Sequence, residues 1–106
     1  MENLNTMTHN DALNLILVEF SKRGCMVARR EVGLFYDRRG VPRKIGTVGE
    51  ADIQGTMPGG QSIAIEVKTG NAVRTKQQKA WAERFISIGG HYILAQIKDK
   101  KDIDKL

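Results

Sequence analysis

The sequence has one cysteine and two histidines in 106 residues. Cys25 alone allows neither a disulfide framework nor a zinc site made of cysteines, and a reducing compartment is its simplest context. His9 and His91 are too few and too far apart in sequence to predict a histidine metal cluster. No apolar run approaches the roughly 20 residues that cross a bilayer, and the first residues lack the pattern of a signal peptide. We therefore expect a cytoplasmic protein.

The composition is that of one globular domain with an excess of positive charge. Apolar residues make up 41% of the chain, and its length suits a single compact core. There are 17 Lys and Arg residues against 12 Asp and Glu, which gives a net charge of +5. This balance favours a polyanionic partner, and nucleic acid is the default candidate. Many soluble domains are equally basic, so charge alone does not distinguish a nucleic-acid-binding protein from an ordinary basic domain.

Segments of helical and strand periodicity predict an α/β domain. From about Thr8 to Arg23, apolar residues recur with the spacing of one helix face, and a second amphipathic helix begins at Thr75. Runs rich in β-branched and aromatic residues, separated by glycine-containing turns, predict strands over residues 27–36, 43–48, 50–53, 62–68 and 91–97. We expect a mixed β-sheet flanked by α-helices in the order α-β-β-β-β-α-β. A charged tail, residues 98–106, follows a core of about residues 10–97.

One predicted strand, residues 62–68, carries a carboxylate and an ammonium on the same side. Glu66 and Lys68 are two residues apart, so they point to one face of a strand that is otherwise too apolar to be exposed. Asp52 precedes them across a Pro-Gly-Gly turn, and pairing of the two strands would place both carboxylates face to face. Opposed carboxylates need a shared positive charge, and Mg²⁺ prefers oxygen ligands of this kind. The plain alternative is a surface ion pair beside a turn aspartate.

Gln78 lies near the start of the second predicted helix, on its apolar stripe. The segment Thr75-Lys-Gln-Gln78 matches a capping box, in which the Gln78 side chain bonds back to the Thr75 backbone. The other reading directs Gln78 over the sheet toward Glu66. The capping role is the more economical of the two, since it needs only local residues.

These residues resemble the virus-type replication–repair nuclease (VRR-NUC) branch of the PD-(D/E)xK nuclease superfamily. The resemblance covers about residues 10–97 and rests on four short motifs in family order: Gly49-Glu50-Ala51-Asp52-Ile53, Ile65-Glu66-Val67-Lys68-Thr69-Gly70, Thr75-x-x-Gln78-x-x-Trp81 and Gly90-x-Tyr92. It implies a PD-(D/E)xK restriction-endonuclease-like core and a single nuclease domain over residues 1–106.

The resemblance also implies the parts of an active site. Asp52 and Glu66, with the backbone carbonyl of Val67, would bind Mg²⁺ or Mn²⁺, Lys68 would be the catalytic lysine, and Gln78 would assist. Family members commonly carry a glutamate near the start of the first helix. That position holds Asn10 here, which can ligate through its carbonyl oxygen but leaves open whether one or two metal ions bind. Glu50 offers one further carboxylate.

The implied activity is metal-dependent hydrolysis of DNA, with selection of branched substrates such as four-way (Holliday) junctions. Related enzymes act as homodimers, and minimal domains of this size resemble phage enzymes, so we expect a bacterial or phage-infected cell. The alternatives are a catalytically silent DNA- or junction-binding module, and a nuclease active only with a partner such as a helicase. We expect phosphate contacts from basic residues of the first hairpin and of the second helix's start: Arg38, Arg39, Arg43, Lys44, Arg74 and Lys76.

Overall fold

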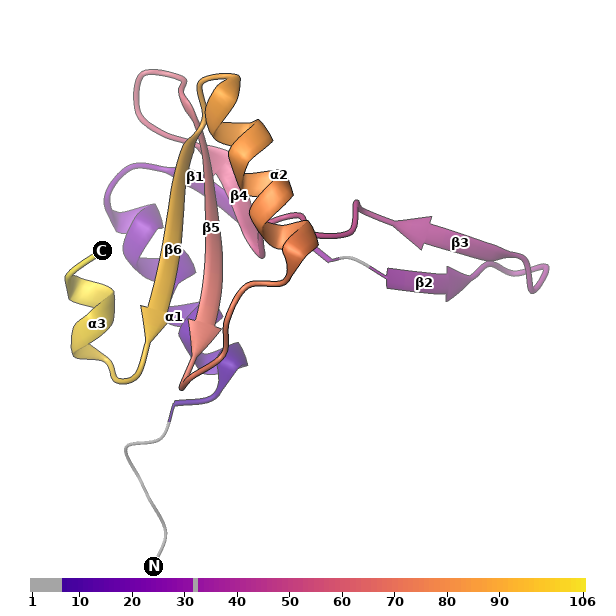
Figure 1. Ribbon diagram of the computed structural model, residues 1–106, viewed down its shortest axis with the longest axis horizontal. Helices are drawn as coiled ribbons and strands as arrows, with labels where there is room; N and C mark the ends of the chain where they lie inside the picture. Colours follow the sequence, from indigo (N-terminus) through magenta and orange to yellow (C-terminus); the bar gives the residue numbers. More distant parts are fainter. Residues whose placement is uncertain (1–6, 32) are drawn as a thin grey trace, which may run out of the picture.

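The computed structural model describes residues 7–31 and 33–106, which form a four-stranded sheet with helices on both faces and a separate two-stranded hairpin (Figure 1). The sheet order is β1-β4-β5-β6. Its strands are β1 (Met26–Arg29), β4 (Ile53–Thr56), β5 (Ser62–Thr69) and β6 (His91–Ile97). The hairpin consists of β2 (Gly33–Tyr36) and β3 (Pro42–Ile45), and the helices are α1 (His9–Lys22), α2 (Lys76–Ser87) and α3 (Lys101–Asp104). None of the described helices is long and apolar enough to span a membrane.

Local sequence signals set the bounds of α1. The Thr8 hydroxyl accepts a hydrogen bond from the backbone N–H of Asp11, which caps the helix start. The helix ends before Gly24, whose φ of 88° lies in the left-handed region that glycine adopts at low cost. Leu13, Ile16 and Phe20 form the buried stripe between these ends. The predicted helix is therefore confirmed, and Thr8 is its N-cap.

The central strand β5 is buried on both faces. Ile63, Ile65 and Val67 belong to the core that α1 covers. Ala64 and Glu66 point to the opposite face, where α2 lies, and they are also buried. The strand is held between two helical layers, so a side chain on either face has little freedom to move.

The register of the sheet leaves the end of β5 uncovered on one side. Strand β4 is antiparallel to β5, and Ile53, its first residue, pairs with Ile65. Strand β5 continues to Thr69, and from Ile63 onward it pairs in parallel with β6, which the chain reaches through α2. Beyond Ile65, β5 therefore has backbone groups on its β4 side that side chains can reach.

Two predicted strands were placed wrongly. In place of one strand over residues 27–36 the structure has β1 and β2, which belong to different sheets, so five strands precede α2 rather than four. The predicted strand 50–53 becomes β4 and starts only at Ile53. Glu50 explains this shift, because its carboxylate accepts hydrogen bonds from the Thr47 backbone and the Gln54 side chain and so competes with the strand ladder.

The C-terminal segment is more than a charged tail. Residues Lys101–Asp104 form α3, and Ile103 is buried in the core beside α1 residues. The Asp102 carboxylate accepts hydrogen bonds from the backbone N–H groups of Lys98 and Asp99, which fixes the turn before the helix. Two apolar residues, Ile103 and Leu106, among seven charged ones were too weak a signal to predict this packing.

Candidate active site

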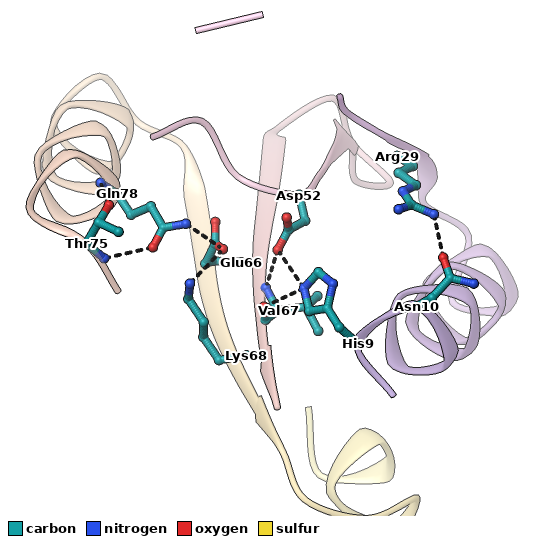
Figure 2. Close-up of polar contacts among 9 residues, drawn as sticks. All are labelled: His9, Asn10, Arg29, Asp52, Glu66, Val67, Lys68, Thr75 and Gln78. Carbon is teal, nitrogen blue, oxygen red and sulfur yellow. Dashed lines mark hydrogen bonds and ion pairs between the residues drawn. The ribbon is translucent and has the colours of Figure 1, made fainter. Parts of the chain in front are cut away.

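The open side of β5 carries the first part of the site (Figure 2). Asp52 immediately precedes β4, and its Oδ2 accepts a hydrogen bond of 2.9 Å from the backbone N–H of Val67. The carboxylate thus takes the place that a β4 backbone carbonyl would occupy if the ladder continued. This bond fixes Asp52 beside the end of β5 while about a quarter of its side chain remains exposed.

His9, in the first turn of α1, approaches the same two residues. Its Nε2 is 3.0 Å from the carbonyl oxygen of Val67 and 3.7 Å from Oδ2 of Asp52 (Figure 2). The imidazole therefore lies next to the backbone carbonyl that the family resemblance implies as a metal ligand. Sequence reasoning missed His9, because a lone histidine at a helix start gives no signal of what tertiary packing brings to it.

Glu66 is the buried carboxylate of the site, with 2% of its surface exposed. Its Oε2 accepts a hydrogen bond of 3.2 Å from Nε2 of Gln78 and lies 3.8 Å from Nζ of Lys68. Its Oε1 is buried without a hydrogen-bond partner among the described residues. Burial, reinforced by the nearby charge of Asp52, raises the pKa of Glu66 to about 8, against a smaller opposing effect of Lys68.

Gln78 has both of the roles that the sequence left as alternatives. Its Oε1 accepts a hydrogen bond from the backbone N–H of Thr75, and its own N–H donates to the Thr75 hydroxyl, which completes the capping box. Its side-chain Nε2 remains available and donates to Glu66. The cap at the start of α2 therefore holds an amide donor in a fixed place above Glu66.

The arrangement fits a divalent cation. An orphaned, buried carboxylate oxygen on Glu66, the partly exposed Asp52 carboxylate and the Val67 carbonyl are hard oxygen donors. In residues 7–31 and 33–106, no group of three or more His, Cys, Asp or Glu side chains is arranged to hold a metal ion, so an ion at this place would depend on fewer side chains, the Val67 carbonyl and water. An open site of this kind suits Mg²⁺ or Mn²⁺, which keep waters and substrate oxygens in their coordination shells.

Tyr92, on β6, is a further polar group near the site. Its hydroxyl is buried with no hydrogen-bond partner in the described part of the chain. Burial raises its pKa, and the charges of Glu66 and Asp52 act in the same direction. The guanidinium of Arg74 lies 5.8 Å from the centre of the Tyr92 ring, which places this predicted DNA contact beside the site.

Other predicted site residues lie elsewhere. The Asn10 side-chain oxygen accepts a hydrogen bond of 2.7 Å from Arg29, on the far side of His9 from Glu66 (Figure 2). Glu50 is buried and forms an ion pair of 2.8 Å with Arg30. Neither is brought to the Asp52 carboxylate. His9, the residue before Asn10 and about 100° away from it around α1, is the one that approaches Val67 and Asp52.

The predicted DNA-contacting residues fall into two groups. Arg38, Arg39, Arg43 and Lys44 are exposed on the β2–β3 hairpin, and Arg43 pairs with Asp37 at 3.2 Å. Lys76 is exposed at the first residue of α2, close in sequence to Arg74. The hairpin extends away from the four-stranded sheet, so its basic tip is distant from the body of the protein (Figure 1).

Comparison with solved structures gives a match that covers most of the chain. No sequence model of a protein family matches the chain, and no curated protein matches it by sequence. A solved structure described as a VRR_NUC domain aligns with a TM-score of 0.65, over 92% of this chain and 91% of that chain, at 21% sequence identity. At this identity the likeness establishes the fold. The chain therefore has the fold of a VRR_NUC domain, as the order of its short sequence motifs predicted.

Proposed function

We propose that this chain is a divalent-metal-dependent DNA endonuclease that hydrolyses phosphodiester bonds and selects branched DNA such as four-way junctions. The observation that carries the proposal is the orphaned oxygen of Glu66, buried beside Lys68 and Gln78 and close to Asp52, on the fold of a VRR_NUC domain. A structural ion pair would satisfy both carboxylate oxygens, because an unpaired buried oxygen is costly.

Asp52, Glu66 and the Val67 carbonyl would hold Mg²⁺ or Mn²⁺. When bound, such an ion supplies a concentrated positive charge that activates water and offsets the charge growing on the phosphate. Lys68, 15% exposed, is placed to orient the attacking water or to stabilise the same charge. The amide of Gln78 holds Glu66 in the orientation that leaves Oε1 free. This set corresponds to the D…ExK pattern of a PD-(D/E)xK core.

DNA as the substrate is supported by charge and its location. The net charge is +5, and basic residues lie both beside the site, at Arg74 and Lys76, and on the hairpin. Two basic regions separated by the length of the hairpin suit a substrate with more than one duplex arm. We take residues 1–106 as one nuclease domain in this proposal, with no separate base-reading unit.

A homodimer is supported by the β2–β3 hairpin. Two isolated strands are marginally stable in water, yet this hairpin exposes Leu34, Phe35 and Tyr36. A second copy would cover such side chains, and a two-fold axis would place two active sites to cut a junction symmetrically.

The test is a cleavage assay on a panel of linear, flapped and four-way-junction DNAs, each with Mg²⁺, Mn²⁺ or EDTA. We expect metal-dependent cuts, concentrated at the branch point and paired across the junction. Asp52→Asn and Lys68→Ala are the matched variants, and both should lose cleavage while still shifting the junction in a binding gel.

Three outcomes would change the proposal. Binding of the junction without any cut would favour the silent binding module. Cleavage that requires an added helicase would favour the partner-dependent nuclease. Equal cutting of linear and branched DNA would remove the structural selectivity but leave the endonuclease activity in place.

A further inference from the structure

The His9 imidazole lies beside two of the atoms that the proposed function assigns to the metal. Its Nε2 is 3.0 Å from the Val67 oxygen and 3.7 Å from the Asp52 oxygen. Because a carbonyl oxygen only accepts, Nε2 carries the hydrogen of this bond. The side chain is about half exposed, so it stands at the solvent side of the site, where an ion would enter.

The spacing of these three atoms suits a shared cation. Two neighbouring ligands of an octahedral ion with bonds of about 2.1 Å lie about 3 Å apart, and opposite ligands lie about 4.2 Å apart. The separation from the Val67 oxygen matches neighbouring ligands, and the separation from the Asp52 oxygen lies between the two values, so a small shift of the Asp52 side chain would complete the geometry. A metal ion that replaces the Nε2 hydrogen, with the remaining ring hydrogen on Nδ1, would find the nitrogen already close to both oxygens.

We propose that His9 is a nitrogen ligand of the metal, beside Asp52 and the carbonyl of Val67. The inference rests on the proposed function, since it concerns the same metal site. It assigns a ligand from α1 that is one residue away from Asn10, whose oxygen is already bonded to Arg29. Thr8, the cap of α1, fixes the backbone from which the imidazole projects.

A nitrogen ligand changes which metals the site prefers. Carboxylate, carbonyl and water ligands suit Mg²⁺. An imidazole ligand instead adds the most affinity for first-row transition metals, whose binding to a given site strengthens from Mn²⁺ to Co²⁺ and Ni²⁺. His9 therefore biases the site away from Mg²⁺ and most strongly toward Co²⁺, with a smaller gain for Mn²⁺. An all-oxygen site, with Asn10 in that place, would lack this bias.

The experiment is titration calorimetry of the full chain with MgCl₂, MnCl₂ or CoCl₂, without DNA. Loss of even an outer partner of a metal ligand costs about 10- to 100-fold in affinity, so His9→Ala should weaken Mn²⁺ and Co²⁺ binding at least tenfold. Its effect on Mg²⁺ should be clearly smaller. His91→Ala removes the other histidine, at the opposite end of the β5–β6 pairing, and should bind all three metals like the wild type.

Pulsed electron paramagnetic resonance of the Mn²⁺-loaded wild type gives a second measurement that needs no variant to fold. We expect a ¹⁴N coupling from a directly bound imidazole, retained in His91→Ala and lost in His9→Ala. Mn²⁺ binding without a ¹⁴N coupling, or with unchanged affinity in a folded His9→Ala variant, would overturn the role of His9 and leave the metal site intact. Failure of the wild type to bind any of the three metals would instead overturn the proposed function itself.

Discussion

Gln78 donates a hydrogen bond from its side-chain amide to the Glu66 carboxylate, at 3.2 Å, while its other amide atom caps α2. One side chain therefore joins the stability of a helix start to the orientation of a buried site residue. The bond directs Oε2 of Glu66 toward α2 and Lys68, and Oε1 has no partner among the residues that the structure describes. The two functions of Gln78 can be separated by substitution.

Thr75→Ala removes the hydroxyl half of the capping box but leaves the Gln78 amide in place. It should lower the free energy of unfolding by about 1 kcal/mol and leave cleavage nearly unchanged below the melting temperature.

Gln78→Glu keeps a residue that can complete the capping box, but it places a second carboxylate against Glu66. Cleavage by Gln78→Glu should fall at least roughly tenfold. If Gln78→Glu cleaves DNA at the wild-type rate, Gln78 acts only as a helix cap.

The raised pKa of Glu66, about 8, predicts a pH-dependent stability in EDTA. Between the ordinary value of 4.5 and the folded value, the folded protein holds a proton that the unfolded chain has released. The stability contributed by the neutral carboxyl is thus complete below pH 4.5 and is lost as the pH rises toward 8. Glu66→Gln has no ionisable group at this position, so this fall in folding stability with rising pH should be absent from the variant.

Denaturant unfolding at about pH 5.5 and about pH 7.5 measures the effect. Relative to the wild type, Glu66→Gln should gain roughly 2 kcal/mol of stability between the two conditions, because one pKa unit corresponds to about 1.4 kcal/mol. Glu83→Gln, an exposed change on α2, is the matched control and should show no such gain. A constant difference between Glu66→Gln and wild type at both pH values would contradict the raised pKa.

Local rules explain which features the sequence could predict. The Thr8 cap, the apolar stripe of α1, the Asp37–Gly40 turn and the Thr75 capping box each depend on residues a few positions apart, and each is present. The proximity of Asp52 and Glu66 was also predictable, because the short turn between their strands fixes an antiparallel register.

The features that sequence missed depend on where chain segments meet in three dimensions. Whether His9 or Asn10 faces Val67 depends on the rotation of α1 over the sheet, which one residue changes by about 100°. Strand β1 separates from the hairpin just after Arg30, whose backbone N–H bonds to the Asp52 carbonyl and whose side chain pairs with Glu50. Neither arrangement is visible in a hydrophobic pattern.

The basic tip of the hairpin should contribute to DNA affinity without reading sequence. Arg38→Ala with Arg39→Ala, in the Asp52→Asn background so that DNA is not cut, should weaken junction binding and lower the slope of log affinity against log salt by about 2. Lys100→Ala with Lys101→Ala, beside and in α3, removes the same charge and should leave that slope nearly unchanged. Equal effects of the two double variants would mean that net charge, rather than the hairpin, determines binding.

Gly49 should be required for the position of α2 relative to the site. Its φ is 87°, and a Cβ there would collide with the backbone oxygen of Gln77, in the first turn of α2. Gly59 has a similar φ of 93°, in the turn between β4 and β5, but a Cβ there would meet open space. The two glycines therefore share a backbone conformation and differ in what surrounds them.

Alanine at either position incurs the left-handed strain of about 1–2 kcal/mol, but only Gly49→Ala adds a collision, worth roughly 1–3 kcal/mol more. Because the collision pushes on the turn that carries Gln78, Gly49→Ala should also lose cleavage, measured with Mn²⁺ below its melting temperature. Gly59→Ala should retain wild-type cleavage with a modest loss of stability. Equal losses in the two variants would show that backbone strain alone matters at Gly49 and that α2 does not depend on this contact for its position.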